Sequence, residues 1–273
     1  MKVAYQGVPG AYSHKAVMQK FPSAEPVNFK TFEEAILALK KGKVDAAMLP
    51  IVNSEAGRVY GMHNLIYEHK VHISAEFFLP VKHCLVAPKG VKFSDVEKIF
   101  SHPQALAQCS SFIKKNKLKE VIWSDTAESV KHLMEKGSKK SAAIASDLAA
   151  EIYGAKILKR NIENDRTNTT RFVVLTRKAK KCKEKNGVIT SIFYITKNIP
   201  AALYKSLAGF ATEGINLLSI ESFMPLKRNG RARFYLEFEG NPNDVHVARA
   251  LEELEFYSDE MRILGTYKEE KHR

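Results

Sequence analysis

Polar side chains follow a predicted buried strand at Asn53 and Ser54, and amide and hydroxyl groups of this kind can bind an anion. The apolar run 44–51 ends just before them. In an open α/β sheet, side chains that follow a buried strand face the crevice in which ligands collect. A plain turn explains the same residues equally well, so the segment is a candidate site with a structural alternative.

A second candidate lies at Ser101-His102-Pro103-Gln104, which has the sequence of a helix start. Pro103 suits the first helical turn, where unpaired backbone N–H groups point outward, and Gln104 adds an amide donor. Together these neutral donors could hold a carboxylate. An ordinary helix start would have the same sequence.

The turn Gly7–Gly10 lies between a predicted strand and a predicted helix, where backbone N–H groups could approach an anion. It lacks the G-x-G-x-x-G spacing of a dinucleotide site, and Pro9 removes one donor. Ser13 and His14 follow the turn. The residues alone favour a capping or surface role over catalysis for both.

The polar segment 161–169 runs into a predicted strand that contains Thr170, Arg171 and Phe172. Loops on a rigid scaffold often carry catalytic residues. Strand alternation predicts Thr170 and Phe172 on one face and Arg171 on the other. The sequence has no H-E-x-x-H, G-x-S-x-G or P-loop motif, which argues against a zinc protease, a serine hydrolase or a nucleotide enzyme.

The elements that must position these residues alternate between strand and helix up to about residue 176. Predicted strands span 2–5, 44–51, 71–88 and 171–175, and Thr31 and Asp125 open helices with capping-box spacing. This order is typical of an α/β fold. Beyond residue 187 the predicted order is βαββαβ, the ferredoxin-like unit, with a helix over 200–212.

The chain is basic, with 43 Lys and Arg against 30 Asp and Glu in 273 residues and a net charge of +13. Its densest basic run, 177–187, has no aromatic residue and is typical of a solvated linker, so nucleic-acid binding is not expected. No apolar run approaches the ~18 residues of a membrane span, and the start does not resemble a signal peptide. We therefore expect a cytoplasmic protein. Three widely spaced cysteines indicate reduced thiols.

Five segments together resemble the prephenate dehydratase family in its monofunctional form with a C-terminal ACT domain. They read YQGVPGAYSHKAV, MLPIVNSEAGRVYGMHNL, SHPQALAQC, AAIASDLAAEIYGAKILKRNIENDRTNTTRFVVLTR and ALYKSLAGFATEGINLLSIESF, in the family's order. The resemblance implies an α/β catalytic region over 1–176, with two subdomains arranged like a type II periplasmic binding protein around a cleft. A basic linker over 177–187 and a ferredoxin-like ACT domain over 188–273 would follow.

The implied reaction is the decarboxylative dehydration of prephenate to phenylpyruvate in L-phenylalanine biosynthesis, with no cofactor and no metal. The family's motifs place catalytic residues at Thr170, Asn53 and Gln104, and substrate-binding residues at Ser54, Ser13, Arg171 and Phe172. In the catalytic region, Val52 stands where the family usually has a glutamate. Two alternatives stay open: arogenate as the substrate, and a non-catalytic cytoplasmic sensor that binds small carboxylates or amino acids.

The resemblance also implies L-phenylalanine as an effector, bound between ACT domains of a homodimer or homotetramer. The implied effector residues are Ala202, Leu203, Asn216, Leu217, Leu218, Glu221 and Ser222. The family's G-A-L motif is Ala201-Ala202-Leu203 here. Its E-S-R-P motif continues with Phe223 and Met224, so control by phenylalanine is a weaker inference than catalysis.

Overall fold

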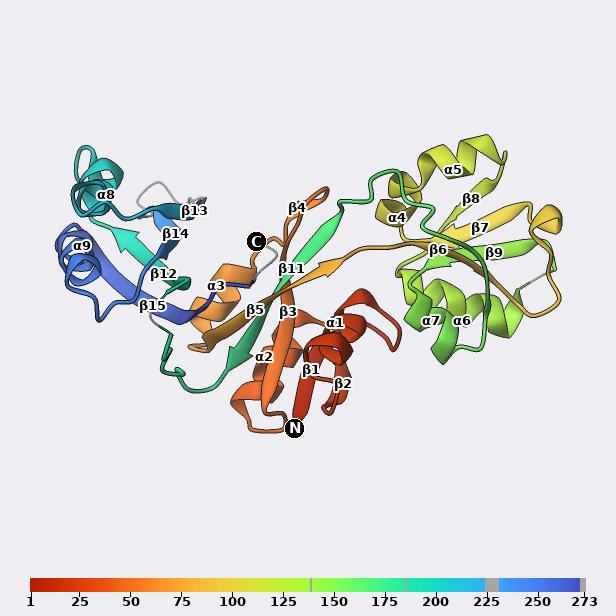
Figure 1. Cartoon of the computed structure of the whole chain (residues 1–273), viewed down its shortest axis with the longest axis horizontal. Helices are drawn as coiled ribbons and strands as arrows, with labels where there is room; N and C mark the ends of the chain where they lie inside the picture. Colours follow the sequence, from red (N-terminus) through yellow and green to blue (C-terminus); the bar gives the residue numbers. More distant parts are fainter. Residues whose placement is uncertain (138, 185, 224–230, 271–273) are drawn as a thin grey trace. The chain divides into compact units, whose positions relative to one another are not determined.

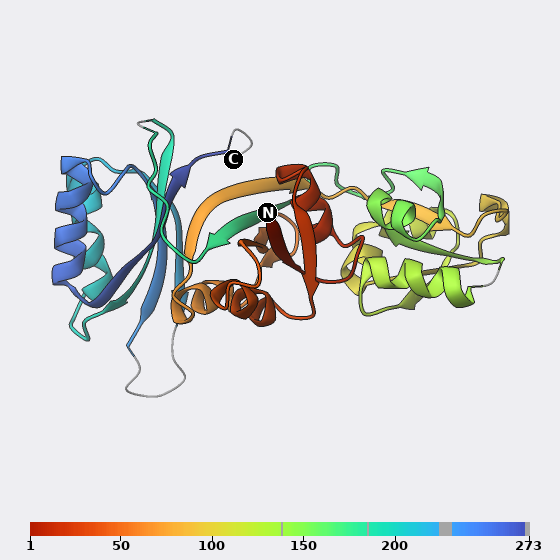
Figure 2. The same ribbon diagram turned by 90° about the horizontal axis from the view of Figure 1, so that it is seen from below.

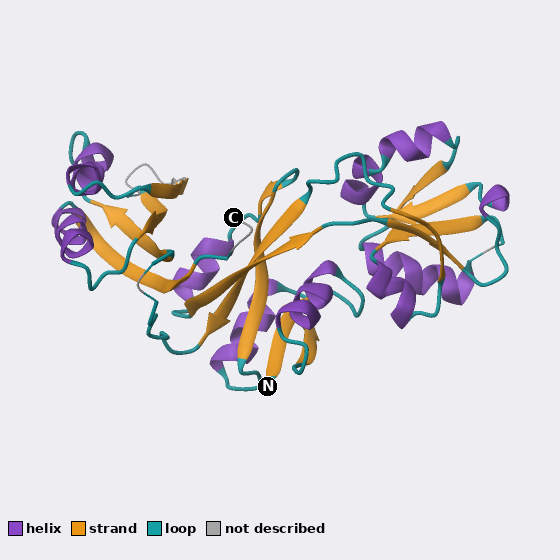
Figure 3. Ribbon diagram, viewed as in Figure 1, coloured by secondary structure: helices purple, strands orange, loops and turns teal. Residues whose placement is uncertain are grey.

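The computed structural model describes residues 1–137, 139–184, 186–223 and 231–270 (Figure 1). Contacts divide the chain into two compact units, the first made of 1–59 and 77–172 and the second of 60–76 and 173–273. Strands β5 (His72–Pro80) and β11 (Thr169–Thr176) each contribute residues to both units. Strands and helices alternate along most of the chain (Figure 3), and the predicted α/β class is confirmed.

The first sheet has the strand order β2-β1-β3-β11-β5, with the short β4 (Gly57–Arg58) paired to β3. Strand β1 (Lys2–Gln6) runs parallel to both β2 (Glu25–Phe29) and β3 (Ala46–Asn53). Helices α1 (Tyr12–Lys20) and α2 (Phe32–Lys40) connect them. Strand β3 extends two residues beyond the predicted end, so Asn53 is its last residue.

Helix α2 begins where the capping-box spacing predicts. The Thr31 hydroxyl accepts a hydrogen bond from the Glu34 N–H at 3.1 Å, which satisfies one of the free donors of the first turn. The next turns bury Ala35, Ile36 and Leu39 on one face. A cap followed by an apolar stripe at helical spacing therefore positions this helix on the sheet.

The second sheet has the order β10-β6-β9-β7-β8, formed by Lys156–Arg160, Cys84–Ala87, Ser141–Ala145, Lys98–Ser101 and Lys119–Ile122. The short 3-10 helix η1 (Phe93–Asp95) precedes β7. The remaining helices of this part are α4 (Pro103–Gln108), α5 (Ser110–Lys115), α6 (Thr126–Lys136) and α7 (Asp147–Ile152).

Strands β6 and β9 of this sheet are buried on both faces. Leu85 and Ile144 pack in a core with residues of α4 and α5, whereas Val86 and Ala145 pack in a core with residues of α6 and α7. Successive side chains of a strand point to opposite faces, so a strand covered on both sides reads as a continuous apolar run. Figure 1 shows helices on both faces of this sheet.

The single long strand predicted over 71–88 is two strands, β5 and β6, separated by residues 81–83. The Val81 N–H donates to the Asn168 carbonyl at 2.8 Å, and the His83 N–H donates to Glu163 Oε2 at 2.9 Å. These donors are satisfied by the segment that returns from β10 to β11, which is why the chain can leave the ladder here.

The C-terminal part has the predicted βαββαβ order. It comprises β12 (Val188–Thr196), α8 (Ala202–Thr212), β13 (Leu217–Phe223), β14 (Arg233–Glu239), α9 (Val245–Phe256) and β15 (Ser258–Lys268). The antiparallel sheet has the order β13-β14-β12-β15, and α8 and α9 cover one face (Figure 2). This is the ferredoxin-like topology. Helix α8 begins at Ala202 rather than at the predicted Pro200, because Ala201 adopts a left-handed conformation with φ 58°.

Helix α3 (Met62–Glu68) packs on the other face of this sheet, within the second unit. The rings of Tyr67 and Phe193 stack at 4.4 Å, and those of His63 and Tyr235 at 3.8 Å. The backbone of β15 comes so close to β5 that a Cβ on Gly265 would lie 2.0 Å from the Ile73 carbonyl oxygen. Only glycine fits at that position.

Candidate active site

The first unit contains a cavity of about 380 Å³, a size that suits a small metabolite. Its polar side chains come from α1, β3, β4, β11, α4, the start of α6 and the segment between β5 and β6: Tyr12, Ser13, Asn53, Arg58, His83, His102, Gln104, Gln108, Thr126 and Thr170. Phe172 and Val81 are among its apolar lining residues. The cavity therefore combines residues that are up to about 160 positions apart in the sequence.

Five of the seven catalytic and substrate-binding candidates line this cavity, namely Ser13, Asn53, Gln104, Thr170 and Phe172. Thr170 and Phe172 share one face of β11, as strand alternation predicts. The structure brings these side chains together, and their roles stay predictions.

Ser54 and Arg171 are not lining residues of this cavity. The Ser54 hydroxyl accepts a hydrogen bond from the Thr169 N–H at 3.0 Å and so ties β3 to β11. Arg171 is buried, with its guanidinium 5.9 Å from the centre of the Phe78 ring. Their predicted contact with substrate has no counterpart in this cavity, and both roles stay predictions.

The amide of Asn53 is held at both ends. Its Nδ2 donates to Thr170 Oγ1 at 2.9 Å and to Asn168 Oδ1 at 2.7 Å. Its Oδ1 accepts from the Ala56 N–H at 2.8 Å. Because Asn53 approaches Thr170 as a donor, the hydroxyl oxygen of Thr170 is an acceptor in this contact and its own proton stays available.

Gln104 and Gln108 lie one turn apart on α4 and both line the cavity. Residues four apart share a helix face, so this spacing in the sequence could have indicated Gln108, which the motif reading missed. His102 caps the helix, with its Nδ1 accepting from the Gln104 N–H at 3.3 Å, and Pro103 occupies the first turn as predicted.

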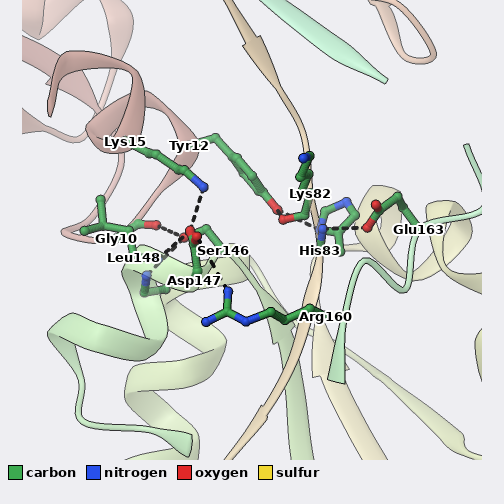
Figure 4. A network of polar contacts seen from close by, with 11 residues as sticks. Gly10, Tyr12, Lys15, Lys82, His83, Ser146, Asp147, Leu148, Arg160 and Glu163 are labelled. Atoms are coloured by element: carbon green, nitrogen blue, oxygen red, sulfur yellow. Dashed lines mark hydrogen bonds and ion pairs between the residues drawn. The ribbon is translucent and has the colours of Figure 1, made fainter. Parts of the chain in front are cut away.

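Sequence reasoning also missed Tyr12 and His83. The two residues are far apart in the sequence, but both line the cavity and they touch in the structure. The Tyr12 hydroxyl is 2.8 Å from His83 Nδ1 and also donates to the Lys82 carbonyl at 2.9 Å (Figure 4). Burial raises the pKa of Tyr12 well above its usual value, so the hydroxyl stays protonated. No local pattern marks a contact between residues 71 positions apart.

Burial also lowers the pKa of His83, an effect opposed in part by its hydrogen bond to Gln108 and by the charge of Glu163. The ring is therefore neutral near pH 7. Among the described lining residues, Arg58 is the only arginine or lysine. An anion in this cavity would be held mainly by uncharged donors.

A second polar cluster joins the turn after β1 to the start of α7 (Figure 4). The Ser146 hydroxyl donates to the Gly10 carbonyl at 2.7 Å, and Lys15 Nζ lies 2.6 Å from Asp147 Oδ1. A Cβ on Gly10, whose φ is +92°, would lie 2.7 Å from Ala149 Cα. The glycine turn thus permits a close packing contact between segments from the two sheets of this unit.

The candidate effector residues lie in the ferredoxin-like domain. Ala202 and Leu203 are in the first turn of α8, and Asn216 precedes β13, which contains the other four: Leu217, Leu218, Glu221 and Ser222. Asn216 Nδ2 donates to Glu239 Oε1 at 3.2 Å, and Glu221 Oε2 is 3.1 Å from His63 Nδ1. Met224 lies outside the described residues.

Within the part of the chain that the structure describes, no group of three His, Cys, Asp or Glu side chains could hold a metal ion. In the same residues, no helix is both long enough and apolar enough to cross a membrane. Cys84, Cys109 and Cys182 are free thiols, and the first two are buried.

Comparison with known sequences identifies close relatives over nearly the whole chain. The profile of the prephenate dehydratase family matches residues 3–180. The bifunctional N-acyl-homoserine lactone acylase/prephenate dehydratase of Komagataeibacter europaeus is 39% identical over 266 residues, covering 97% of this chain and 95% of the relative. Arogenate dehydratase/prephenate dehydratase 1 of Arabidopsis thaliana is 37% identical over 281 residues, covering 98% of this chain and 72% of the relative.

Solved structures also resemble this chain over nearly its whole length. The quorum-quenching acylase GqqA superposes with a TM-score of 0.94 at 38% identity, covering 99% of each chain. The prephenate dehydratase of Arthrobacter aurescens, in complex with L-Phe, superposes with a TM-score of 0.91 at 29% identity, covering 100% of this chain and 91% of that one. On the matched profile, the relatives and the shared fold, this chain belongs to the prephenate dehydratase family of lyases.

Proposed function

We propose that this protein converts prephenate to phenylpyruvate, CO₂ and water, as a step of L-phenylalanine biosynthesis. The observation that supports it best is the contact between Asn53 and Thr170 in the wall of the cavity, with Nδ2 2.9 Å from Oγ1. It presents a hydroxyl group whose proton is free for a ligand.

The chemistry requires a donor at one point of the substrate. Prephenate carries a ring carboxylate, a pyruvyl carboxylate and a hydroxyl opposite the quaternary carbon. The bond to the ring carboxylate breaks, its electron pair enters the ring, and the hydroxyl departs as the ring becomes aromatic. In this proposal Thr170 donates a hydrogen bond or proton to that departing hydroxyl, a role that typically contributes about 10²–10⁴-fold.

Asn53 assists Thr170 in this scheme. Its N–H donates to Thr170 Oγ1, and hydrogen bonds in a chain strengthen one another inside a protein. Because both ends of the Asn53 amide are engaged with the protein, other lining residues bind the substrate carboxylates in this scheme, among them Ser13, Gln104 and Arg58. Such donors, positioned before the reaction, stabilise charge without reorganising.

The decisive experiment follows phenylpyruvate release from prephenate at neutral pH, with the uncatalysed reaction as the reference. Parallel reactions contain arogenate, whose side chain has an ammonium group where prephenate has a keto group. Turnover of prephenate that is faster than the uncatalysed reaction and faster than turnover of arogenate supports the proposal. Turnover of arogenate alone makes the protein an arogenate dehydratase. Turnover of neither leaves a small-carboxylate binder. The lactone acylase activity named for the Komagataeibacter relative is measured alongside.

We also propose that residues 188–273 form an ACT domain that binds L-phenylalanine and controls a catalytic region over 1–176 through the linker 177–187. The support is the ferredoxin-like topology and the L-Phe complex of the Arthrobacter relative. Ala202, Leu203 and Asn216 would form part of this site, together with β13. Calorimetric titration tests the proposal, and no saturable heat at millimolar phenylalanine would exclude it.

Assembly through the ferredoxin-like domain, as a homodimer or homotetramer, is part of the same proposal. Strand β13 is an edge strand of its sheet, and Ile220 on it is 46% exposed. Tyr204 on α8 is 77% exposed. An open edge with apolar neighbours favours pairing with another chain. Light scattering after gel filtration distinguishes a monomer, which would contradict the proposal, from an oligomer.

A further inference from the structure

Three side chains from separate segments form one hydrogen-bonded chain in the wall of the cavity. Tyr12 lies on α1, His83 between β5 and β6, and Gln108 at the end of α4. The Tyr12 hydroxyl is 2.8 Å from His83 Nδ1, and His83 Nε2 is 2.9 Å from Gln108 Oε1. His83 is 2% exposed and Gln108 is 8% exposed, so water does not compete for these contacts.

The contact between His83 and the Gln108 amide oxygen decides the direction of this chain. The Tyr12 hydroxyl is protonated, and the neutral His83 ring has one N–H. Because the Gln108 amide oxygen can only accept, the ring proton must be on Nε2. Nδ1 is then an acceptor for the single Tyr12 hydrogen, which lies within reach of both Nδ1 and the Lys82 carbonyl. The contact of Nε2 with the oxygen of the Gln108 amide, rather than with its nitrogen, matches this direction.

The backbone of His83 is also anchored, so the ring has little freedom to turn away. Its N–H donates to Glu163 Oε2 at 2.9 Å (Figure 4). The ionisable groups that face His83 are thus Tyr12 from α1 and Glu163 from the segment after β10. Neither supplies an acceptor to Nε2, which faces Gln108.

The contact with His83 sets the orientation of the Gln108 amide. With its oxygen occupied by His83, the amide turns its NH₂ group away from His83, and among the described residues this group has no acceptor. Because Gln108 lines the cavity, both hydrogens remain for a ligand. A flipped amide would present its oxygen to the cavity and repel an anion.

We propose that His83 is a positioning residue whose Nε2–H holds the Gln108 amide with its N–H donors toward the cavity, where they bind a carboxylate of the substrate. The identity of that substrate rests on the proposed function. The arrangement of Tyr12, His83 and Gln108 does not depend on it.

The kinetic test compares two amide replacements of the ring. In His83→Gln the amide nitrogen can occupy the place of Nε2 and still donate to Gln108. In His83→Asn the shorter side chain reaches only the place of Nδ1. We expect His83→Gln to keep KM for prephenate within about threefold and His83→Asn to raise it about 10–100-fold, with a smaller change in kcat, because a hydrogen bond to a charged group is lost.

Gln108→Glu completes the comparison, since it presents only acceptors to the cavity and should raise KM at least as much as His83→Asn. Equal KM values for the two His83 variants, or a loss confined to kcat, would overturn the proposal. Circular dichroism and thermal unfolding show that the variants compared are folded.

A second measurement needs no enzymatic activity. It requires only the wild-type protein and one folded variant, His83→Gln, as a reference. In ¹⁵N-labelled protein at pH 7.5, long-range ¹H–¹⁵N correlations report which ring nitrogen of each histidine carries a proton, and the signals lost in His83→Gln belong to His83. A proton on Nε2 is expected. An unprotonated Nε2 contradicts the proposal even if prephenate is turned over. Conversely, a wild-type protein inactive on prephenate and arogenate overturns the proposed function, while this measurement still decides the state of His83.

Discussion

The cavity of the first unit and one sheet face of the second unit, the face that carries Ser191, Glu237 and Tyr267, both bury polar groups. The hydrogen bonds of these groups have different roles in the two regions. In the cavity, Asn53 donates to Thr170, and His83 Nε2 contacts the Gln108 amide oxygen. These hydrogen bonds orient the two side chains, and Thr170 and Gln108 keep donors for a ligand. On the sheet face, the fully buried Glu237 accepts hydrogen bonds from Tyr267 at 3.1 Å and Ser191 at 3.3 Å.

The buried polar residues of the sheet face are hydrogen-bonded to one another. Ser191, Glu237 and Tyr267 lie on the adjacent strands β12, β14 and β15, and the Tyr235 hydroxyl also donates to Glu237. A buried polar network that is fully satisfied makes a rigid, specific core. Burial of polar groups therefore does not by itself mark a site; in the cavity, Thr170 and Gln108 also keep donors that a ligand can reach.

Thr170→Ala should separate the two regions most clearly. Removing the donor at the leaving group is expected to lower kcat about 10²–10⁴-fold. The midpoint of thermal unfolding should change little, because the lost hydrogen bond from Asn53 is worth about 1 kcal/mol and Asn53 Nδ2 keeps its bond to Asn168 Oδ1. Steady-state kinetics with prephenate checks the first effect. Thr170→Ser, which keeps the hydroxyl, is the matched control, and a fall in its kcat as large as that of Thr170→Ala would argue against the role.

Glu237→Ala should lower stability and leave catalysis unchanged, the reverse of Thr170→Ala. Several buried hydroxyl groups lose their shared acceptor, so the free energy of unfolding should fall by roughly 2–4 kcal/mol while kcat of the folded protein is kept. Urea denaturation followed by circular dichroism measures the loss. Glu239→Ala, at an exposed position of the same strand, should cost less than about 1 kcal/mol. Equal losses in the two variants would contradict a stabilising role of this buried network.

Gly10→Ala tests the packing contact beside the cavity. The new Cβ would lie 2.7 Å from Ala149 Cα, so we expect a loss of roughly 2–3 kcal/mol together with a raised KM. Gly90→Ala isolates the backbone contribution, because Gly90 has a similar φ of +89° but no neighbour within 4 Å of its Cβ. Its loss should be about 1 kcal/mol. If both variants lose the same stability, the close approach at Gly10 has no energetic weight.

Asp147→Asn should have the smallest effect. Burial raises the pKa of Asp147, but the hydrogen bond and charge of Lys15, the Leu148 N–H and Arg160 together hold it below its usual value. Because the pKa of the folded state is the lower one, the carboxylate stabilises the fold at neutral pH, and this stabilisation is lost as the pH falls below about 4.

The side chain of Asp147 is 42% exposed, so the contribution should stay below about 1 kcal/mol. Thermal unfolding of both proteins from pH 7 to pH 3 measures it. The difference between wild type and Asp147→Asn should narrow toward pH 3, and a difference that widens there would contradict the sign.

Local patterns were sufficient for several elements. The capping residues Thr31 and Asp125 accept hydrogen bonds where their spacing predicts them. The βαββαβ order of the C-terminal part and the shared face of Thr170 and Phe172 also follow from short-range periodicity. These features depend on residues within a few positions of one another.

Other features depend on contacts across the chain. The apolar run 71–88 reads as one strand, and only the donors of Val81 and His83, satisfied by Asn168 and Glu163, divide it. Likewise, Ser54 and Arg171 adjoin residues of the cavity in the sequence, yet the structure directs both side chains to other partners. A pattern along the chain does not show which partner a polar group will find.

The fold class, the ferredoxin-like C-terminal topology, the family resemblance and four of the ten polar residues that line the cavity follow from the sequence alone, because those properties are encoded in periodicity and short motifs. The tertiary structure alone decided that Tyr12, His83 and Gln108 form one chain of hydrogen bonds and that Asn53 faces Thr170 as a donor. The direction of a hydrogen bond depends on distances between atoms of remote segments, and only the folded chain brings those atoms together.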